Sequence, residues 1–144
     1  MTATMDLDYI TTDLRPLAVP VADLREDPKN ARRHPEANLA AVSESVRQFT
    51  QRKPIVVNAK TGIVEAGNGT LAIARQLGWT HIAAVLVEDD KKTATAFALA
   101  DNRTGELAEW DPAALLAGLD ELGDAWDVEA MGFGDEFVDA MLEQ

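Results

Sequence analysis

A glycine-rich turn between an apolar run and a helical run is the feature that most constrains this fold. A short apolar run at residues 63–64 leads into the turn, and an alanine- and leucine-rich stretch at residues 71–77 follows it as far as Gly78. The turn consists of Gly67, Asn68, Gly69 and Thr70. Glycine lets the backbone turn sharply, and the free N–H groups at the start of a helix hold phosphate or another anion. The segment predicts a strand, a turn and a helix, with either a phosphate-binding turn or a tight connection without ligand.

The other strand candidates are short. They are residues 20–24, 55–57, 62–64 and 82–87. The second and third are separated by turn residues and predict a hairpin. The last is almost entirely apolar, which predicts a central strand of the sheet.

Helices are expected between these strands. Apolar residues recur every three or four positions over residues 36–49, which predicts a helix with one buried face. Asp89 or Asp90 can cap a second helix over residues 91–102. Because strands and helices do not alternate strictly, we expect a small α+β domain.

The charge of the chain is concentrated at one end. Residues 1–103 hold all 13 Lys and Arg and an equal number of Asp and Glu, whereas residues 104–144 hold 12 acidic residues and no Lys or Arg. This acidic stretch predicts two helices, one opened by Asp111 and Pro112 and one over residues 135–142. Its charge repels nucleic-acid phosphates, so we expect no strong duplex DNA binding. It is either a solvated face or a docking surface for a basic partner.

Three segments follow from these patterns. Residues 1–16 lack a clear period and are expected to form a flexible arm. Residues 17–104 are the α+β domain, and residues 105–144 form an acidic helical extension packed on it. The absence of cysteine excludes disulfides and thiol nucleophiles. The chain also lacks a run of about twenty apolar residues and a signal-peptide pattern. We therefore expect a soluble cytoplasmic protein without a membrane partner.

Polar groups in two further segments accompany the glycine-rich turn. Arg32 and Arg33 lie in a loop bounded by prolines, and Asp101, Asn102 and Arg103 follow the second helical run. The arginine loop, residues 49–57, the glycine-rich turn and the Asp101–Arg103 segment follow one another in this order along the chain. This arrangement resembles the N-terminal domain of ParB, in the ParB/sulfiredoxin superfamily, over about residues 17–104. It is most similar to phage and plasmid members and to ParB-like domains joined to DNA methyltransferases, which share the Ala-Asp-Asn-Arg run, the Trp-Asp pair and the late Gly-Phe element.

The resemblance implies a small mixed sheet flanked by helices and a site for a nucleotide, CTP or ATP, with Mg²⁺. The phosphate ligands that it implies are Arg32, Arg33, Gly67, Asn68, Gly69, Thr70, Asn102 and Arg103. Asp101 and Asn102 match a Glu-Asn pair that serves phosphates and magnesium. Arg103 either reaches the same ligand or offsets the helix dipole. Thr70 stands where relatives carry arginine, which removes one phosphate-binding cation.

Several activities remain open for such a fold. A nucleotide-binding module would couple binding to dimerisation or to a partner protein. As an enzyme it would be a slow Mg²⁺-dependent nucleoside triphosphatase, with Asp101 and Glu65 as the catalytic candidates. Glu65 is either a general base or an exposed carboxylate at a strand end. The alternatives are a ParB-like nuclease and a non-catalytic module accessory to a DNA methyltransferase. The sulfiredoxin reaction is excluded, since it requires a cysteine.

Overall fold

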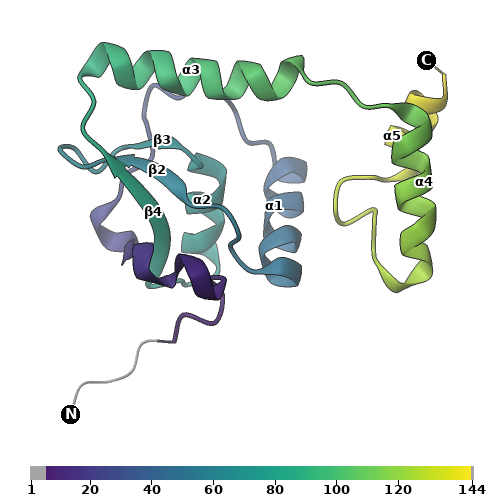
Figure 1. Cartoon of the computed structure of the whole chain (residues 1–144), viewed down its shortest axis with the longest axis horizontal. Coiled ribbons are helices and arrows are strands. Elements are labelled where there is room, and N and C mark those ends of the chain that lie inside the picture. Colours follow the sequence, from purple (N-terminus) through teal and green to yellow (C-terminus); the bar gives the residue numbers. More distant parts are fainter. Residues whose placement is uncertain (1–5, 144) are drawn as a thin grey trace.

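A four-stranded mixed sheet forms the centre of the protein. The computed structural model describes residues 6–143. The strand order is β1-β4-β2-β3, and β2 and β4 are parallel while the two outer pairs are antiparallel (Figure 1). The strands are β1 (Ala18–Pro20), β2 (Ile55–Asn58), β3 (Val64–Ala66) and β4 (His81–Val87). The expected α+β class, the central position of β4 and the hairpin of β2 and β3 are confirmed.

Five α-helices surround or follow the sheet. They are α1 (Glu36–Phe49), α2 (Asn68–Gln76), α3 (Lys91–Leu107), α4 (Pro112–Leu122) and α5 (Asp135–Leu142). Asp90 caps α3 by accepting a hydrogen bond from the Thr93 N–H at 2.7 Å, and Asp111 caps α4 through the Ala114 N–H at 3.1 Å. The hydrogen bonds from Thr93 lower the pKa of the Asp90 carboxyl. These caps satisfy backbone donors that a helix start leaves free.

The hydrophobic core lies on one face of the sheet, between the strands and α2. Its buried members are Val21, Leu24, Ile55, Val57, Val64, Leu71, Ala74, Ile82 and Ala84. Fully burying an aliphatic side chain of this size contributes roughly 1.5–3 kcal/mol, so this face supplies most of the stabilisation of the domain. The opposite face of β3 contacts α3, which has no buried residue of its own.

The segment expected to be a flexible arm is integrated into the domain from residue 6 onward, while residues 1–5 lie outside the described residues. Ile10 is 0% exposed and forms a bridge with Gln51. The Tyr9 ring stacks on Trp79 with a centroid distance of 4.2 Å. The 3-10 helix Thr12–Leu17 and β1 follow directly. A single buried apolar residue produces no periodicity, which is why the sequence pattern did not show this packing. The strand expected at residues 20–24 is also displaced, because a 3-10 helix occupies Val21–Asp23.

Gln51 completes the sheet where β2 has not yet begun. It is 2% exposed, and its side-chain amide accepts a hydrogen bond from the Ala83 N–H at 2.9 Å and donates to the Ala83 carbonyl at 3.0 Å. It also donates to the Lys53 carbonyl at 3.0 Å. The side chain therefore replaces a strand neighbour for β4 and connects the N-terminal segment to the sheet.

We expect Gln51→Leu to lower the free energy of unfolding by about 2–4 kcal/mol, because three hydrogen bonds are lost and the buried backbone groups of Ala83 keep no partner. Urea unfolding followed by circular dichroism measures this loss. Gln48→Leu is the control, since Gln48 is exposed and bonds only to Glu44 on the same helix. Equal losses in the two variants would contradict the role given to Gln51.

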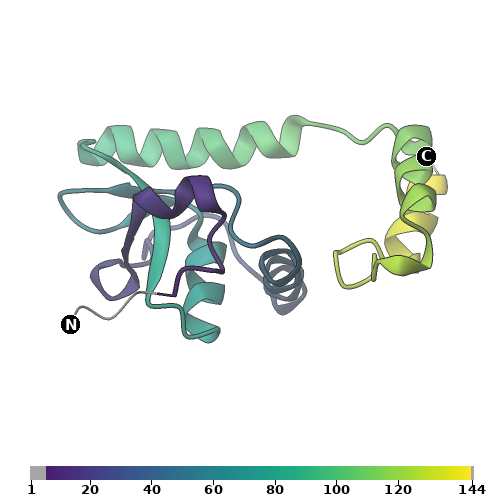
Figure 2. The same ribbon diagram turned by 60° about the horizontal axis from the view of Figure 1, so that its bottom comes forward.

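Helix α3 connects the domain to the acidic extension. It runs across the top of the sheet in Figure 1, and the turned view of Figure 2 shows that α4 and α5 lie beyond its C-terminal end. The helix continues to Leu107, so the expected helix end near residue 102 and the segment boundary at residues 104 and 105 both fall inside it. None of the helices in residues 6–143 is long and apolar enough to cross a membrane.

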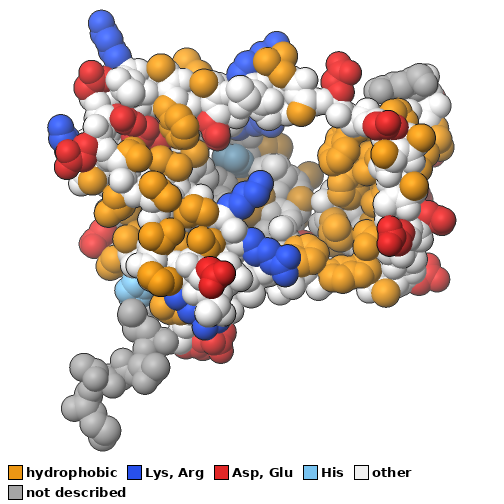
Figure 3. Space-filling model, in the orientation of Figure 1, with side chains coloured by type: hydrophobic (Ala, Val, Ile, Leu, Met, Phe, Trp, Pro, Cys, Tyr) orange, Lys and Arg blue, Asp and Glu red, His pale blue; other side chains and the backbone are white. Residues whose placement is uncertain are grey.

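The extension contacts the domain through α1. The Trp126 ring stacks on Phe49 with a centroid distance of 5.4 Å, and within the extension Phe133 contacts Trp110 and Phe137 edge to face. Figure 3 shows an opening below the C-terminal half of α3, and apolar side chains of the extension border it on the right. The extension is therefore joined to the domain covalently through α3 and contacts it through the aromatic pair at α1.

Candidate functional site

The turn between β3 and α2 presents three backbone N–H groups. Gly67 has a φ of 102°, and a Cβ atom at this position would overlap the Ile55 side chain. It caps α2 without a side-chain hydrogen bond, and the first bond of the helix runs from the Leu71 N–H to the Gly67 carbonyl. The N–H groups of the first three helical residues thus have no partner within α2. This geometry has the free N–H groups that an anion-binding turn requires.

Asn68 and Gly69 connect the turn to neighbouring segments. The Asn68 side chain accepts a hydrogen bond from the Asp27 N–H at 3.0 Å and donates to the Val64 carbonyl at 3.3 Å. A Cβ on Gly69 would lie 3.0 Å from the His34 ring. The Asn68 amide therefore holds the loop before α1 against the end of β3.

Residues from three distant segments line a small pocket at this turn. Its volume is about 150 Å³. The lining includes Arg32, Glu65, Gly67, Asn68, Gly69, Thr70, Asp101 and Asn102 among the residues that the sequence singles out, together with Asn30, His34 and Asn38. Arg33 is exposed, and neither Arg33 nor Arg103 lines the pocket.

An acidic residue on α3 engages the nearby arginines. Glu106 forms ion pairs with Arg32 and, at 3.3 Å, with Arg103. The side chains of Arg32 and Glu106 are 45% and 44% exposed. An ion pair this exposed contributes about 0–1 kcal/mol, so it holds Arg32 only weakly. Glu106 could not be recognised from the sequence, because nothing in the pattern places α3 above the loop before α1.

Asp101 and Asn102 offer oxygen atoms to the same pocket. Asp101 is exposed, and Asn102 uses its Nδ2 atom to donate to the Ala98 carbonyl at 2.9 Å, which leaves its Oδ1 atom available. Residues 6–143 contain no group of three His, Asp or Glu residues able to hold a metal ion. Mg²⁺ typically takes one or two protein oxygens beside phosphate oxygens and water, and Asp101 and Asn102 fit that pattern.

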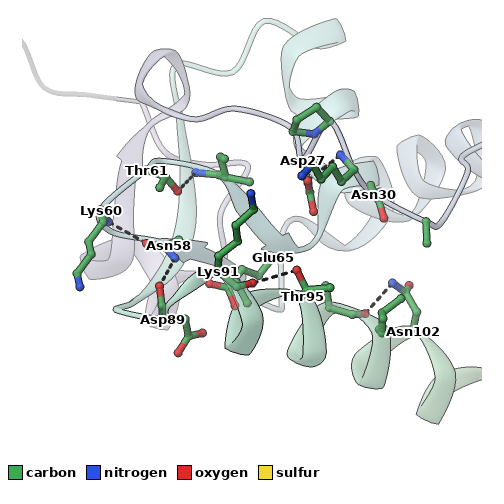
Figure 4. Close-up of a pocket in the computed structure, with 17 residues that line it drawn as sticks. Asp27, Asn30, Asn58, Lys60, Thr61, Glu65, Asp89, Lys91, Thr95 and Asn102 are labelled. Carbon is green, nitrogen blue, oxygen red and sulfur yellow. Dashed lines mark hydrogen bonds between the residues drawn. The ribbon is translucent and has the colours of Figure 1, made fainter.

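A second, larger cavity adjoins the small pocket. Its volume is about 460 Å³, and it lies between residues 27–31, the β2–β3 hairpin and α3 (Figure 4). Ile63, Ala94, Ala98 and Leu99 contribute apolar surface to it. Asn30, Glu65 and Asn102 line both spaces. This cavity is not predicted by the sequence pattern, although Ala94, Ala98 and Asn102 recur every four residues along α3.

Glu65 is buried, contrary to the exposed strand-end position that the sequence analysis gave as one alternative. The residue is 4% exposed, and neither carboxylate oxygen has a hydrogen-bond partner within residues 6–143. Burial, together with the nearby Asp89 carboxyl and against the opposing effect of the Asn58 amide, raises the pKa of Glu65 to about 7. Neighbouring Val64 belongs to the core, so β3 is covered on both faces.

The sheet, the turn before α2 and the pocket beneath α3 define a small α+β domain with free N–H groups at the pocket. No protein-family model matches the chain, and no curated protein matches its sequence. Solved structures that share its fold include ParB from Caulobacter crescentus complexed with CTP-gamma-S, with a TM-score of 0.68 and 18% identity over 87% of this chain and 75% of that chain.

Two more structures extend this comparison. The same Caulobacter protein complexed to the centromeric parS site has a TM-score of 0.50 and 18% identity, over 87% of this chain and 69% of that one. A Pnob8-like ParB-N domain has a TM-score of 0.51 and 21% identity, over 75% of this chain and 44% of that one. The chain therefore has the fold of ParB N-terminal domains.

The pKa of Glu65 makes the stability of the protein depend on pH. Its folded-state pKa is about 7, against 4.5 for an unperturbed Glu, so the folded state binds more protons between these values. The free energy of unfolding therefore falls as the pH rises through this window, by up to about 3 kcal/mol.

Urea unfolding of wild type, Glu65→Gln and Glu88→Gln at about pH 5 and about pH 8 measures this effect. Glu65→Gln should lack the decrease, whereas Glu88→Gln should retain it because Glu88 is exposed. A parallel decrease in all three proteins would assign the pH dependence to other groups.

Proposed function

We propose that this protein is a nucleotide-binding module for a ligand of the CTP or ATP class. The triphosphate would occupy the small pocket at the turn before α2, and the nucleoside would occupy the larger cavity. The observation that carries the proposal is the convergence of Arg32, the free N–H groups of residues 68–70 and the Asp101–Asn102 pair. A neighbour with the same fold is complexed with CTP-gamma-S, which supports the same ligand class here.

The two adjoining spaces match the two halves of a nucleotide. Phosphates need N–H donors and a guanidinium group, which the turn and Arg32 offer. A base needs a largely apolar slot with a few polar groups, which the space between the hairpin and α3 offers. Bound Mg²⁺ would neutralise phosphate charge, with Asp101 and Asn102 as its protein ligands.

Coupling of nucleotide binding to dimerisation or to a partner protein is part of this proposal. A phage, plasmid or mobile-element role and a DNA-modifying partner remain expectations from the sequence resemblance. If the nucleotide is hydrolysed, the reaction would be slow, because Thr70 provides no charge where relatives carry arginine. Asp101 and Glu65 are the residues to test for such hydrolysis.

A ParB-like nuclease is the second candidate. The neighbour complexed to parS shows that a protein with this fold can engage DNA. Here the 12 acidic residues of positions 104–144 oppose phosphate binding at that end. Magnesium-dependent DNA cleavage that Asp101→Ala abolishes would favour the nuclease, whereas a protein that binds neither nucleotide nor DNA would favour an interaction module.

Arg32 and Arg33 provide a matched pair of variants for the proposed site. Arg32→Ala should weaken binding of CTP or ATP with Mg²⁺ by about tenfold or more, because a charge-assisted hydrogen bond to phosphate is lost. Arg33→Ala should change the affinity by less than about twofold, since Arg33 lies outside the pocket. Isothermal titration calorimetry measures both. Equal effects, or no binding by the wild-type protein, would argue against phosphates at this turn.

Restoring the missing charge should strengthen binding. Thr70 lines the pocket, so Thr70→Arg should tighten triphosphate binding by about tenfold to a hundredfold, which corresponds to roughly 1.5–3 kcal/mol. The same titration with the nucleoside lacking phosphates is the control, and its affinity should not change. Unchanged triphosphate binding would place the phosphates away from Thr70.

A further inference from the structure

Glu65 is a buried carboxyl group that has no hydrogen-bond partner in the described chain. Its two oxygens are both buried and unpaired. Burial of a polar group without a hydrogen bond is unfavourable, and folded proteins rarely retain such a group without a reason. A ligand that donates a hydrogen bond would supply the missing partner.

The carboxyl lies where such a ligand would sit. Glu65 projects from the face of β3 opposite to Val64, beneath α3, and lines both the larger cavity and the small pocket. Figure 4 shows it among the side chains of the larger cavity. The charged groups that share that cavity are Asp27, Lys29, Lys60, Asp89 and Lys91. The Asp89 carboxyl and the Asn58 amide lie close enough to shift the pKa of Glu65. Neither Glu65 oxygen has a hydrogen-bond partner within residues 6–143, so a donor on a ligand can pair with it.

We propose that Glu65 selects the base of the bound nucleotide by accepting a hydrogen bond from its exocyclic amino group. This inference rests on the nucleotide-binding function proposed above. It predicts that cytosine and adenine are preferred over uracil and hypoxanthine, which have the same ring sizes but carry a keto oxygen instead of the amino group. A keto oxygen would face a carboxylate oxygen, and two acceptors cannot form a hydrogen bond.

The shape and chemistry of the cavity agree with a planar ring. Ile63 and Ala94 contribute apolar surface, and Ala98 extends it along α3. Such a wall binds both members of an amino and keto pair equally well, because it discriminates poorly between groups of equal size. Selectivity must then come from a polar group, and Glu65 is the buried polar side chain without a partner.

The test compares matched nucleotide pairs in the full-length protein. Calorimetry with Mg²⁺ at about pH 8, where a carboxyl with a pKa of about 7 is mostly ionised, measures CTP against UTP and ATP against ITP. The wild-type protein should prefer the amino member of any pair that binds by about tenfold or more. Glu65→Gln should reduce the preference to less than about threefold, because an amide can rotate to present either a donor or an acceptor.

Two further variants control the result. Glu65→Leu should lose the preference as well and should weaken binding of the amino base, while removal of an unpaired buried carboxyl should not prevent folding. Glu88→Gln changes an exposed acid next to Asp89 and should keep the wild-type preference. Thermal unfolding shows whether each variant is folded. If Glu65→Leu is unfolded, the base preference of Glu65→Gln alone tests the inference.

The outcomes separate this inference from the proposed function. Equal affinity for amino and keto members in the wild type, or an unchanged preference in Glu65→Gln, would overturn base selection by Glu65. If binding in that case still depends on Arg32, the nucleotide-binding function stands without it. Absence of binding by all four nucleotides would overturn both.

Discussion

The close approach of Gly67 to Ile55 is the contact on which the site depends. With no side chain at Gly67 and a left-handed backbone, the end of β3 can lie directly against β2 before α2 begins. Any Cβ would push the strand and the helix apart. This contact fixes the start of α2 relative to the sheet, and the first N–H groups of the helix are therefore oriented by the core itself.

The surrounding segments are positioned from the same turn. Asn68 holds the loop before α1 through the Asp27 N–H, and that loop brings Arg32 to the pocket. Helix α3 approaches from the other side with Asp101 and Asn102. The site is thus assembled from side chains on three separate segments around one rigid turn. The fold of ParB N-terminal domains supplies this scaffold, and the chemistry depends on the residues that this chain places on it.

Local features of this structure could be predicted from the sequence, and long-range ones could not. The turn at Gly67 and the cap at Asp90 follow from residue types at fixed offsets. The bridge between Ile10 and Gln51 joins distant positions without periodicity. The burial of Glu65 could not be predicted from the sequence either, because only the position of α3 shows that β3 is covered on both faces.

Residues that are adjacent in the sequence can also occupy different positions relative to the pocket, which composition does not show. Arg32 and Arg33 are the same residue type in one loop, yet only Arg32 lines the pocket. Their different positions follow the backbone after the Asn30 turn, where the Asn30 side chain accepts a hydrogen bond from the Arg32 N–H at 3.1 Å. The end of α3 was misjudged for another reason, since Thr104 and Gly105 are weak helix formers that the helix nevertheless includes.

Helix α3 is stabilised little by its own sequence. Lys91 and Lys92 stand at its positive N-terminal end and Glu106 at its negative C-terminal end, which is the unfavourable orientation for charges on a helix dipole. No residue of α3 is buried, so the Asp90 cap and contacts along one side hold it in place. Helix α3, which covers the site, thus has few buried contacts, and local opening of such an element requires less free energy than global unfolding. Since the same helix covers the larger cavity and leads into α4 and α5, an opening of α3 would displace the cavity wall and the C-terminal helices together.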